Sequence, residues 1–270
     1  MTTSPIHQQR LAVVTGASSG IGRAFAVLLA EKGYELVLAA DEPEVHELAV
    51  ELTTAGRTVV SVEVDLATRD GVELLHERVA GHGAPVAVGI LNAGMGVHGR
   101  FDHAALDDQL RLVDLNVRST LHLSVLLARD MVARQEGRLL LVSSIAGEGP
   151  GPGHAAYAAS KAFVHSFAEA ARHELTDTGV TVTSLQPGPT DTAFFERADM
   201  EDTRVAQGPK DSPEDVARDG FEALMAGRDH VVAGSWRNTV QAAGASVVPD
   251  PVAARIAARQ TEQQTPGTGE

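Results

Sequence analysis

The chain has 270 residues, a formal net charge of −14 and no cysteine. This length suits one large α/β domain, and the lack of cysteine excludes disulfides, thiolate metal sites and a cysteine nucleophile. The acidic balance argues against nucleic acid or an anionic membrane surface as a partner, and with no apolar leader or run of about 18 apolar residues we expect a soluble cytoplasmic protein.

The first part of the chain alternates apolar runs with amphipathic segments. The pattern predicts strands at residues 11–15, 35–40 and 58–64, with a helix at 21–32 and another around 45–52. Gly33 is suited to end the first of these helices. A β-α-β-α-β order is typical of a parallel sheet that has helices on both faces.

The same alternation continues to the end of the chain. It predicts helices at 69–80, 107–134 and 154–178, strands at 86–91, 138–143, 180–185 and 229–233, and a capped helix from Ser212. Residues 189–211 have no clear period and are predicted to form a loop. We therefore expect one catalytic domain over residues 1–260 and a disordered tail at 261–270.

A glycine-rich turn separates the first strand from the first helix. It reads Thr15-Gly-Ala-Ser-Ser-Gly-Ile-Gly22, with glycines at 16, 20 and 22. Glycines let the backbone turn tightly and approach a pyrophosphate, which the free N–H groups of the helix N-terminus attract. The turn therefore predicts a dinucleotide-binding site.

Tyr157 and Lys161 are four residues apart within a predicted helix. This spacing places them on one face, about one turn from each other. A tyrosine titrates near 10, and a neighbouring ammonium would favour its phenolate, so the pair suits general acid/base chemistry.

These motifs together resemble the short-chain dehydrogenase/reductase family. The set comprises the glycine turn, Asn92-Ala-Gly94, Asn116, Ser144, Tyr157 with Lys161, and Pro187-Gly188, in the order and spacing of that family. The resemblance spans about residues 10 to 195. It implies a single-domain, doubly wound Rossmann-type parallel sheet of about seven strands. It also implies hydride transfer between NAD(H) or NADP(H) and a secondary alcohol, ketone or aldehyde.

The resemblance also implies a role for each catalytic residue. Tyr157 would exchange a proton with the substrate oxygen, and Lys161 would lower the tyrosine pKa and bind the nicotinamide ribose. Ser144 would hydrogen-bond the substrate oxygen; Ser143 is the alternative, because adjacent strand residues point to opposite faces. Asn116 would hold a water that links Lys161 to solvent.

The cofactor contacts follow from the same resemblance. They are expected at Gly16, Ser18, Ser19, Gly20, Ile21, Gly22, Asp41, Asp65, Leu66, Asn92, Ala93, Gly94, Tyr157, Lys161, Pro187, Gly188, Thr190 and Thr192. Asp65 is open to a second interpretation as a plain turn residue. No metal site is expected, and none of the eleven histidines is given a role, although His154 could line the mouth of the site.

The choice of cofactor depends on the end of the second strand. Asp41 and Ser19 stand where NADP-using relatives commonly carry basic residues. A carboxylate about 5 Å from a 2′-phosphate would repel it by roughly 3 kcal/mol, so NAD(H) is favoured over NADP(H). The NAD-type aspartate usually stands one place earlier, at Ala40. The alternative is that Asp41 points away and Arg23 contacts the phosphate.

Four further points are left open by the sequence. Phe194, Phe195 and Met200 either form a substrate lid or pack locally, and Trp236 either packs on the sheet edge or borders the pocket. Relatives pair the helix at 107–134 with a second subunit, so a homodimer or homotetramer is expected. The rival function is a non-catalytic dinucleotide sensor on the same fold; an epimerase would need a larger substrate domain after Pro187.

Overall fold

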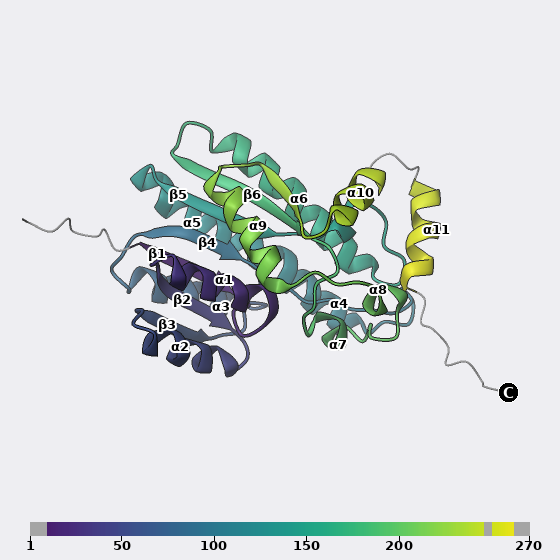
Figure 1. Ribbon diagram of the computed structural model, residues 1–270, viewed down its shortest axis with the longest axis horizontal. Helices are drawn as coiled ribbons and strands as arrows, with labels where there is room; N and C mark the ends of the chain where they lie inside the picture. Colours follow the sequence, from purple (N-terminus) through teal and green to yellow (C-terminus); the bar gives the residue numbers. More distant parts are fainter. Residues whose placement is uncertain (1–9, 246–249, 262–270) are drawn as a thin grey trace, which may run out of the picture.

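The computed structural model describes residues 10–245 and 250–261, which build one seven-stranded parallel sheet (Figure 1). The strands are β1 (Leu11–Thr15), β2 (Glu35–Ala40), β3 (Val59–Glu63), β4 (Val86–Leu91), β5 (Gly137–Val142), β6 (Val180–Pro187) and β7 (His230–Ala233). Their order is β3-β2-β1-β4-β5-β6-β7. The order reverses between β1 and β4, and ligands of such sheets bind at the carboxyl ends beside this switch point. The doubly wound fold is confirmed.

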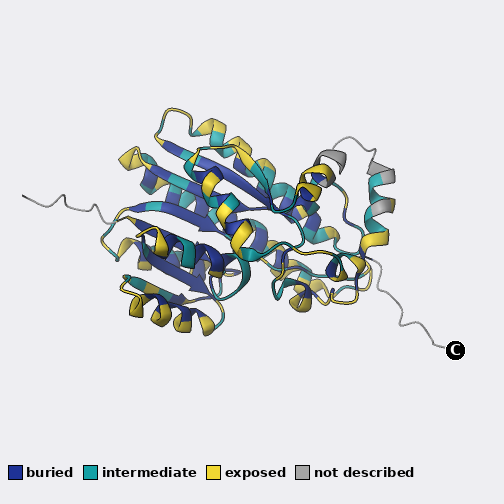
Figure 2. Ribbon diagram, viewed as in Figure 1, coloured by how far each residue is buried: buried dark blue, intermediate teal, exposed yellow. Residues whose placement is uncertain are grey.

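Helices cover both faces of the sheet. On one face lie α1 (Gly20–Glu31), α2 (Glu44–Thr54) and α9 (Pro213–Met225), and on the other α3 (Arg69–Ala80), α5 (Thr120–Arg134) and α6 (Ala155–Glu174). In β1, Ala12 and Val14 pack into the first core, while Leu11 and Val13 pack into the second. Because successive side chains alternate between faces, a strand buried on both sides is apolar throughout, as the dark inner strands of Figure 2 show.

The predicted helix at 107–134 has an interruption in its hydrogen-bond pattern. It comprises α4 (Leu106–Val113), a π-helical turn at Asp114–Ser119, and α5. Asn116 lies within the π-helical turn and is buried. Such turns are rare and frequently lie at functional sites.

The part of the chain after β6 differs most from the prediction. The segment predicted as an irregular loop contains α7 (Phe194–Arg197) and α8 (Arg204–Gln207), and two further helices follow β7, α10 (Trp236–Ala245) and α11 (Asp250–Thr261). Trp236 is 73% exposed and does not line the cavity at the carboxyl ends of the strands, so most of its side chain packs on neither of the two surfaces that the sequence left open. The tail was predicted to begin at residue 261, but Thr261 is the buried last residue of α11. The rest of the predicted tail, 262–270, and the first nine residues lie outside the described residues. Among the described helices, none combines the length and apolar character needed to span a membrane.

Candidate active site

A cavity of about 650 Å³ lies at the carboxyl ends of the strands. The residues that follow β1, β2, β4 and β5 all contribute to its wall, among them Gly16, Asp41, Asn92 and Ser144. From the glycine turn the cavity reaches past Tyr157 to α11. It therefore joins the predicted dinucleotide site to the predicted catalytic residues.

The glycine turn forms one wall of this cavity and fits a dinucleotide phosphate. Gly16 and Gly20 have φ of 62° and 53°, values that residues with a Cβ rarely adopt. Ser19, the N-cap residue of α1, has an extended backbone, and its side chain makes no capping hydrogen bond. No N-cap side chain therefore covers the first N–H groups of α1. Ser19, Gly20 and Ile21 all line the cavity. A helix N-terminus of this kind is a ready-made anion site.

Asn92 holds the turn against the sheet. Its Nδ2 donates to the carbonyl oxygens of Thr15 (3.0 Å) and Gly16 (3.2 Å). In the other direction, Thr15 Oγ1 accepts from the backbone N–H groups of Asn92 (2.9 Å) and Ala93 (3.0 Å). Gly22 fits beneath the turn, because a Cβ there would lie 2.0 Å from the carbonyl oxygen of Gly16. These contacts fix the backbone that faces the cofactor.

Tyr157 and Lys161 project from the first turns of α6 into the same cavity. The Lys161 ammonium lies 5.7 Å from the centre of the Tyr157 ring and donates to the carbonyl oxygen of Val142 at 2.9 Å. That contact uses one of three donors. The remaining donors can serve ribose hydroxyls, so the residues present fit the nicotinamide half of a dinucleotide.

Burial controls the protonation of both side chains. Desolvation raises the pKa of Tyr157 to about 12, while a hydrogen bond with Ser144 acts in the opposite direction. Desolvation lowers the pKa of Lys161 to about 8. The predicted lowering of the tyrosine pKa is therefore not found in the protein alone, because loss of water around the phenol outweighs the favourable contacts. At neutral pH Tyr157 carries its proton and Lys161 is charged.

The two serines after β5 face opposite ways. Ser143 is buried, and its Oγ donates to the carbonyl oxygen of Lys161 at 2.7 Å. Ser144 Oγ donates to the carbonyl oxygen of Pro187 at 3.4 Å and accepts from the N–H of Ala146 at 3.1 Å. Its hydroxyl also lies close enough to the Tyr157 phenol to act against the rise of the Tyr157 pKa. Both serines line the cavity, but the Ser143 hydroxyl is engaged by the backbone of α6, which favours Ser144 as the residue that faces the substrate.

Asn116 supports the site from behind. Its side-chain amide accepts from the N–H of Met95 and donates to its carbonyl oxygen, both at 2.9 Å, and also donates to Ser160 Oγ at 3.0 Å. Asn116 therefore ties the segment after β4 to α6. A Cβ on Gly94 would lie 3.1 Å from Asn116 Oδ1 and 3.3 Å from Lys161 Nζ, so glycine permits this close packing.

The opposite end of the cavity carries alternating charges. Arg111 lies 2.8 Å from Asp65 and 3.6 Å from Asp41, and its guanidinium lowers the pKa of Asp65. Glu42 accepts from Ser18 Oγ at 2.7 Å and pairs with Arg197 of α7 at 2.9 Å. Each cavity carboxylate thus has an arginine partner that also lines the cavity.

The structure bears on one alternative at this end. Arg23, the alternative phosphate contact, pairs with Glu51 at 2.8 Å and lies outside the cavity lining, which disfavours that alternative. Asp41 itself lines the cavity and is 57% exposed in its side chain.

Most of the predicted site residues line the cavity together. Gly22, Asp65 and Asn116 do not line the cavity. Gly22 permits the tight glycine turn, Asp65 holds Arg111, and Asn116 holds Met95. His154 lines the cavity, and burial lowers its pKa to about 4. Sequence reasoning missed Arg111, Arg197 and the residues of α11, because their positions follow no local motif.

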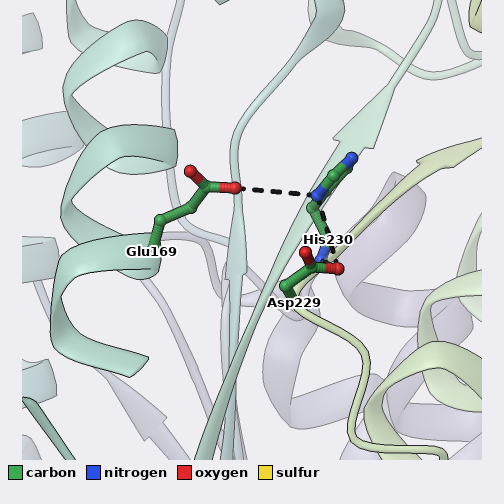
Figure 3. Close-up of side chains that lie close together, drawn as sticks. All are labelled: Glu169, Asp229 and His230. Atoms are coloured by element: carbon green, nitrogen blue, oxygen red, sulfur yellow. Dashed lines mark hydrogen bonds and ion pairs between the residues drawn. The ribbon is translucent and has the colours of Figure 1, made fainter. Parts of the chain in front are cut away.

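A second polar cluster lies outside the cavity, between α6 and β7. Glu169 and Asp229 approach His230 Nδ1 to 3.6 and 3.5 Å (Figure 3). His165, one turn before Glu169 on α6, lies 3.7 Å from that carboxylate. The three residues of Figure 3 are exposed, so the contacts are those of a solvated ion-pair network.

Fold and cavity together define an α/β oxidoreductase that binds a nicotinamide dinucleotide, and comparison with known proteins agrees. Residues 10–202 match the family model for short chain dehydrogenase. An uncharacterised oxidoreductase of Staphylococcus epidermidis is 29% identical over 194 residues, which cover 72% of this chain and 83% of that protein.

Solved structures give the same result. A short-chain dehydrogenase from Sphingobium yanoikuyae in complex with NADPH has a TM-score of 0.77 and 27% identity, over 83% of this chain and 87% of its own. A short-chain dehydrogenase/reductase from Burkholderia phymatum in complex with NAD has the same TM-score and identity, over 83% and 89%. The chain belongs to the short-chain dehydrogenase/reductase family.

Proposed function

We propose that the protein reversibly reduces a ketone to a secondary alcohol, or an aldehyde to a primary alcohol, with Tyr157 as the acid/base. The observation that carries this proposal is the convergence of Tyr157 and Ser144 in the cavity, with Lys161 below the tyrosine ring. NAD(H) or NADP(H), when bound, supplies or accepts the hydride. The protein must then orient the substrate oxygen and move one proton.

Tyr157 is set to act as an acid in the protein alone. Because its pKa is about 12, it holds its proton at neutral pH and can donate it to the carbonyl oxygen as negative charge develops there. The Ser144 hydroxyl can donate to the same oxygen. The Lys161 ammonium would stabilise the phenolate that remains, because opposite charges attract strongly in a dry site. Asn116 would keep Lys161 and the segment after β4 in place, beside the water of the proposed proton relay.

We also propose that NAD(H) is preferred over NADP(H). Three carboxylates, those of Asp41, Glu42 and Asp65, surround two guanidiniums at the far end of the cavity. The local balance is therefore negative, and a 2′-phosphate would add two further negative charges to it. Titration of the nicotinamide fluorescence with NADH and NADPH tests this preference, and tighter binding of NADPH would contradict it.

A homo-oligomer is proposed from the surface of α4 and α5. Leu106, Leu110 and Val113 are 67%, 54% and 43% exposed, and Leu121 on α5 is 39% exposed. A row of exposed aliphatic side chains on adjoining helices suits an interface between copies. Light scattering should give the mass of a dimer or tetramer, and Leu110→Glu should shift it toward the monomer.

Turnover separates the enzyme from a non-catalytic sensor. Wild-type protein should oxidise NADH or NADPH in the presence of a ketone, and Tyr157→Phe should lose this activity by at least about a hundredfold, the usual scale of acid/base catalysis. Cofactor binding should persist in the variant. Cofactor binding without turnover in the wild-type protein, over a panel of ketones and aldehydes, would favour the sensor.

A further inference from the structure

The cavity changes character between its two ends. The ionisable side chains among its described lining residues are Asp41, Glu42, Arg111, Arg197 and Lys161, besides Tyr157 and His154. The first four lie at the glycine turn and the end of β2, where they pair with one another or with Asp65. Lys161 is held to the carbonyl oxygen of Val142. Charge is therefore concentrated where the dinucleotide would lie.

Beyond Tyr157 most of the wall is apolar, and its polar side chains, His154, Gln260 and Thr261, include no cation at neutral pH. We call the part lined by Met95, Ile145, Phe194, Met200, Ala253 and Ala257 the substrate end of the cavity. The Phe194 ring lies 5.2 Å from the Tyr157 ring, which fixes this wall next to the proposed acid. His154, whose ring lies 6.1 Å from Tyr157, has its pKa lowered to about 4 and is neutral at pH 7. The described lining of the substrate end thus offers no cation to an anionic substrate.

Helix α11 closes this end of the cavity. Ala253 and Ala257 are one turn apart on α11 and both line it. The last residue of the helix, Thr261, is buried; its Oγ1 donates to the carbonyl oxygen of Pro152 at 2.8 Å, and its own carbonyl oxygen accepts from His98 Nε2 at 3.1 Å. These contacts hold α11 against the loop that precedes α6, and α11 also packs on α8 (Figure 1).

We infer that the substrate is an uncharged, apolar ketone or secondary alcohol whose hydrocarbon part lies between α7 and α11. This inference rests on the proposed function and narrows it to a substrate class. An apolar wall favours hydrocarbon, because burial removes apolar surface from water. A carboxylate or phosphate placed there would lose much of its hydration without gaining a cation as a partner. The small side chains of Ala253 and Ala257 leave room for the hydrocarbon.

A matched pair of methyl ketones tests the inference. The compounds 2-heptanone and 6-oxoheptanoate differ only in a terminal methyl group or carboxylate. With wild-type enzyme, kcat/KM should be at least about a hundredfold higher for 2-heptanone. Discrimination of this size is expected when a site buries a polar group without giving it a partner. Equal values, or a preference for the oxo acid, would overturn the inference.

Binding to an inactive complex separates this inference from the proposed function. Calorimetric titration of the Tyr157→Phe protein with NADH bound should show 2-heptanone binding and at least about tenfold weaker binding of 6-oxoheptanoate. If that binding selectivity appears while the wild-type protein reduces neither ketone, the proposed function fails, but the inferred preference of the substrate end for uncharged, apolar ligands is supported. If the complex binds neither compound, or both equally, the inference fails.

A variant of α11 tests the wall itself. Ala257→Lys adds a cation to the substrate end and should move the kcat/KM ratio toward 6-oxoheptanoate by at least about tenfold. Ala258→Lys, one residue along the same helix and outside the cavity lining, should leave the ratio unchanged. Ala253→Lys provides a second site if thermal unfolding shows that the first variant is not folded. An unchanged ratio in a folded lining variant would contradict the placement of α11.

Discussion

The guanidinium of Arg197 lies 2.9 Å from the carboxylate of Glu42, although 155 residues separate the two in the chain. Arg197 also donates to Ser19 Oγ at 3.3 Å. Arg197 belongs to α7. Phe194, three residues before Arg197 on the same helix, packs against Tyr157. One short helix therefore contacts both the proposed acid and the residues at the dinucleotide end of the cavity.

This pair leads to a prediction about cofactor choice. Glu42→Gln removes a negative charge and leaves the Arg197 guanidinium without its partner, so NADPH should gain about tenfold in affinity relative to NADH. Fluorescence titration with both cofactors measures the ratio. Glu51→Gln is the control, because Glu51 pairs with Arg23 outside the cavity lining. If both variants give the same ratio, Glu42 does not discriminate between the cofactors.

The buried amide of Asn116 should contribute to folding stability. Asn116→Ala removes three hydrogen bonds and leaves the N–H and carbonyl groups of Met95 without that partner, so unfolding free energy should fall by about 2–4 kcal/mol. Ser160→Ala removes one of these bonds and should cost about 1 kcal/mol. Urea denaturation compares the two, and equal losses would contradict the role given to Asn116.

Lys161 should make stability rise at alkaline pH. Its pKa is about 8 in the folded protein and about 10.5 when unfolded, so between these values the unfolded chain holds the extra proton. Stability should therefore increase from about pH 8 to 10, by up to about 1.4 kcal/mol per pH unit relative to Lys161→Met. Denaturation of both proteins at several pH values measures the difference. A constant difference would show that burial does not depress the lysine pKa.

His154 should make the protein sensitive to acid. Its pKa is about 4 in the folded protein, below the ordinary 6.5, so the unfolded chain binds the proton first as pH falls. The unfolding free energy should decrease as the pH falls from about 6.5 to 4. In His154→Gln this decrease should be smaller, by on the order of 1–3 kcal/mol. Denaturation midpoints between pH 4 and 7 provide the test. Parallel pH curves for the two proteins would refute the assignment.

Local patterns predicted the part of the site that depends on spacing along the chain. The turn from Gly16 to Gly22 and the Tyr157–Lys161 pair follow from strand and helix geometry, and the structure places Gly16, Gly20, Tyr157 and Lys161 around one cavity. Alternation along a strand identified the conflict between Ser143 and Ser144, and the contacts of the folded chain decided it. The acid/base role of Tyr157 stays a prediction until turnover is measured.

Tertiary contacts determined what the patterns could not predict. Arg23 was a candidate because it follows the glycine turn, but α1 directs it toward Glu51 on α2. Arg111 and Arg197 reach the dinucleotide end from distant helices, so no spacing marks them. The tyrosine pKa depends on how much water the surrounding chain removes, which a sequence does not reveal.

The docking of α11 has a consequence for how this enzyme can be altered. The family model ends at residue 202, whereas Ala253 and Ala257 complete the wall beyond Tyr157. The glycine turn and the proposed acid/base residues are thus encoded apart from the helix that closes the pocket. Substitutions in α11 can therefore reshape the proposed substrate end without altering the sequence of the glycine turn or of α6.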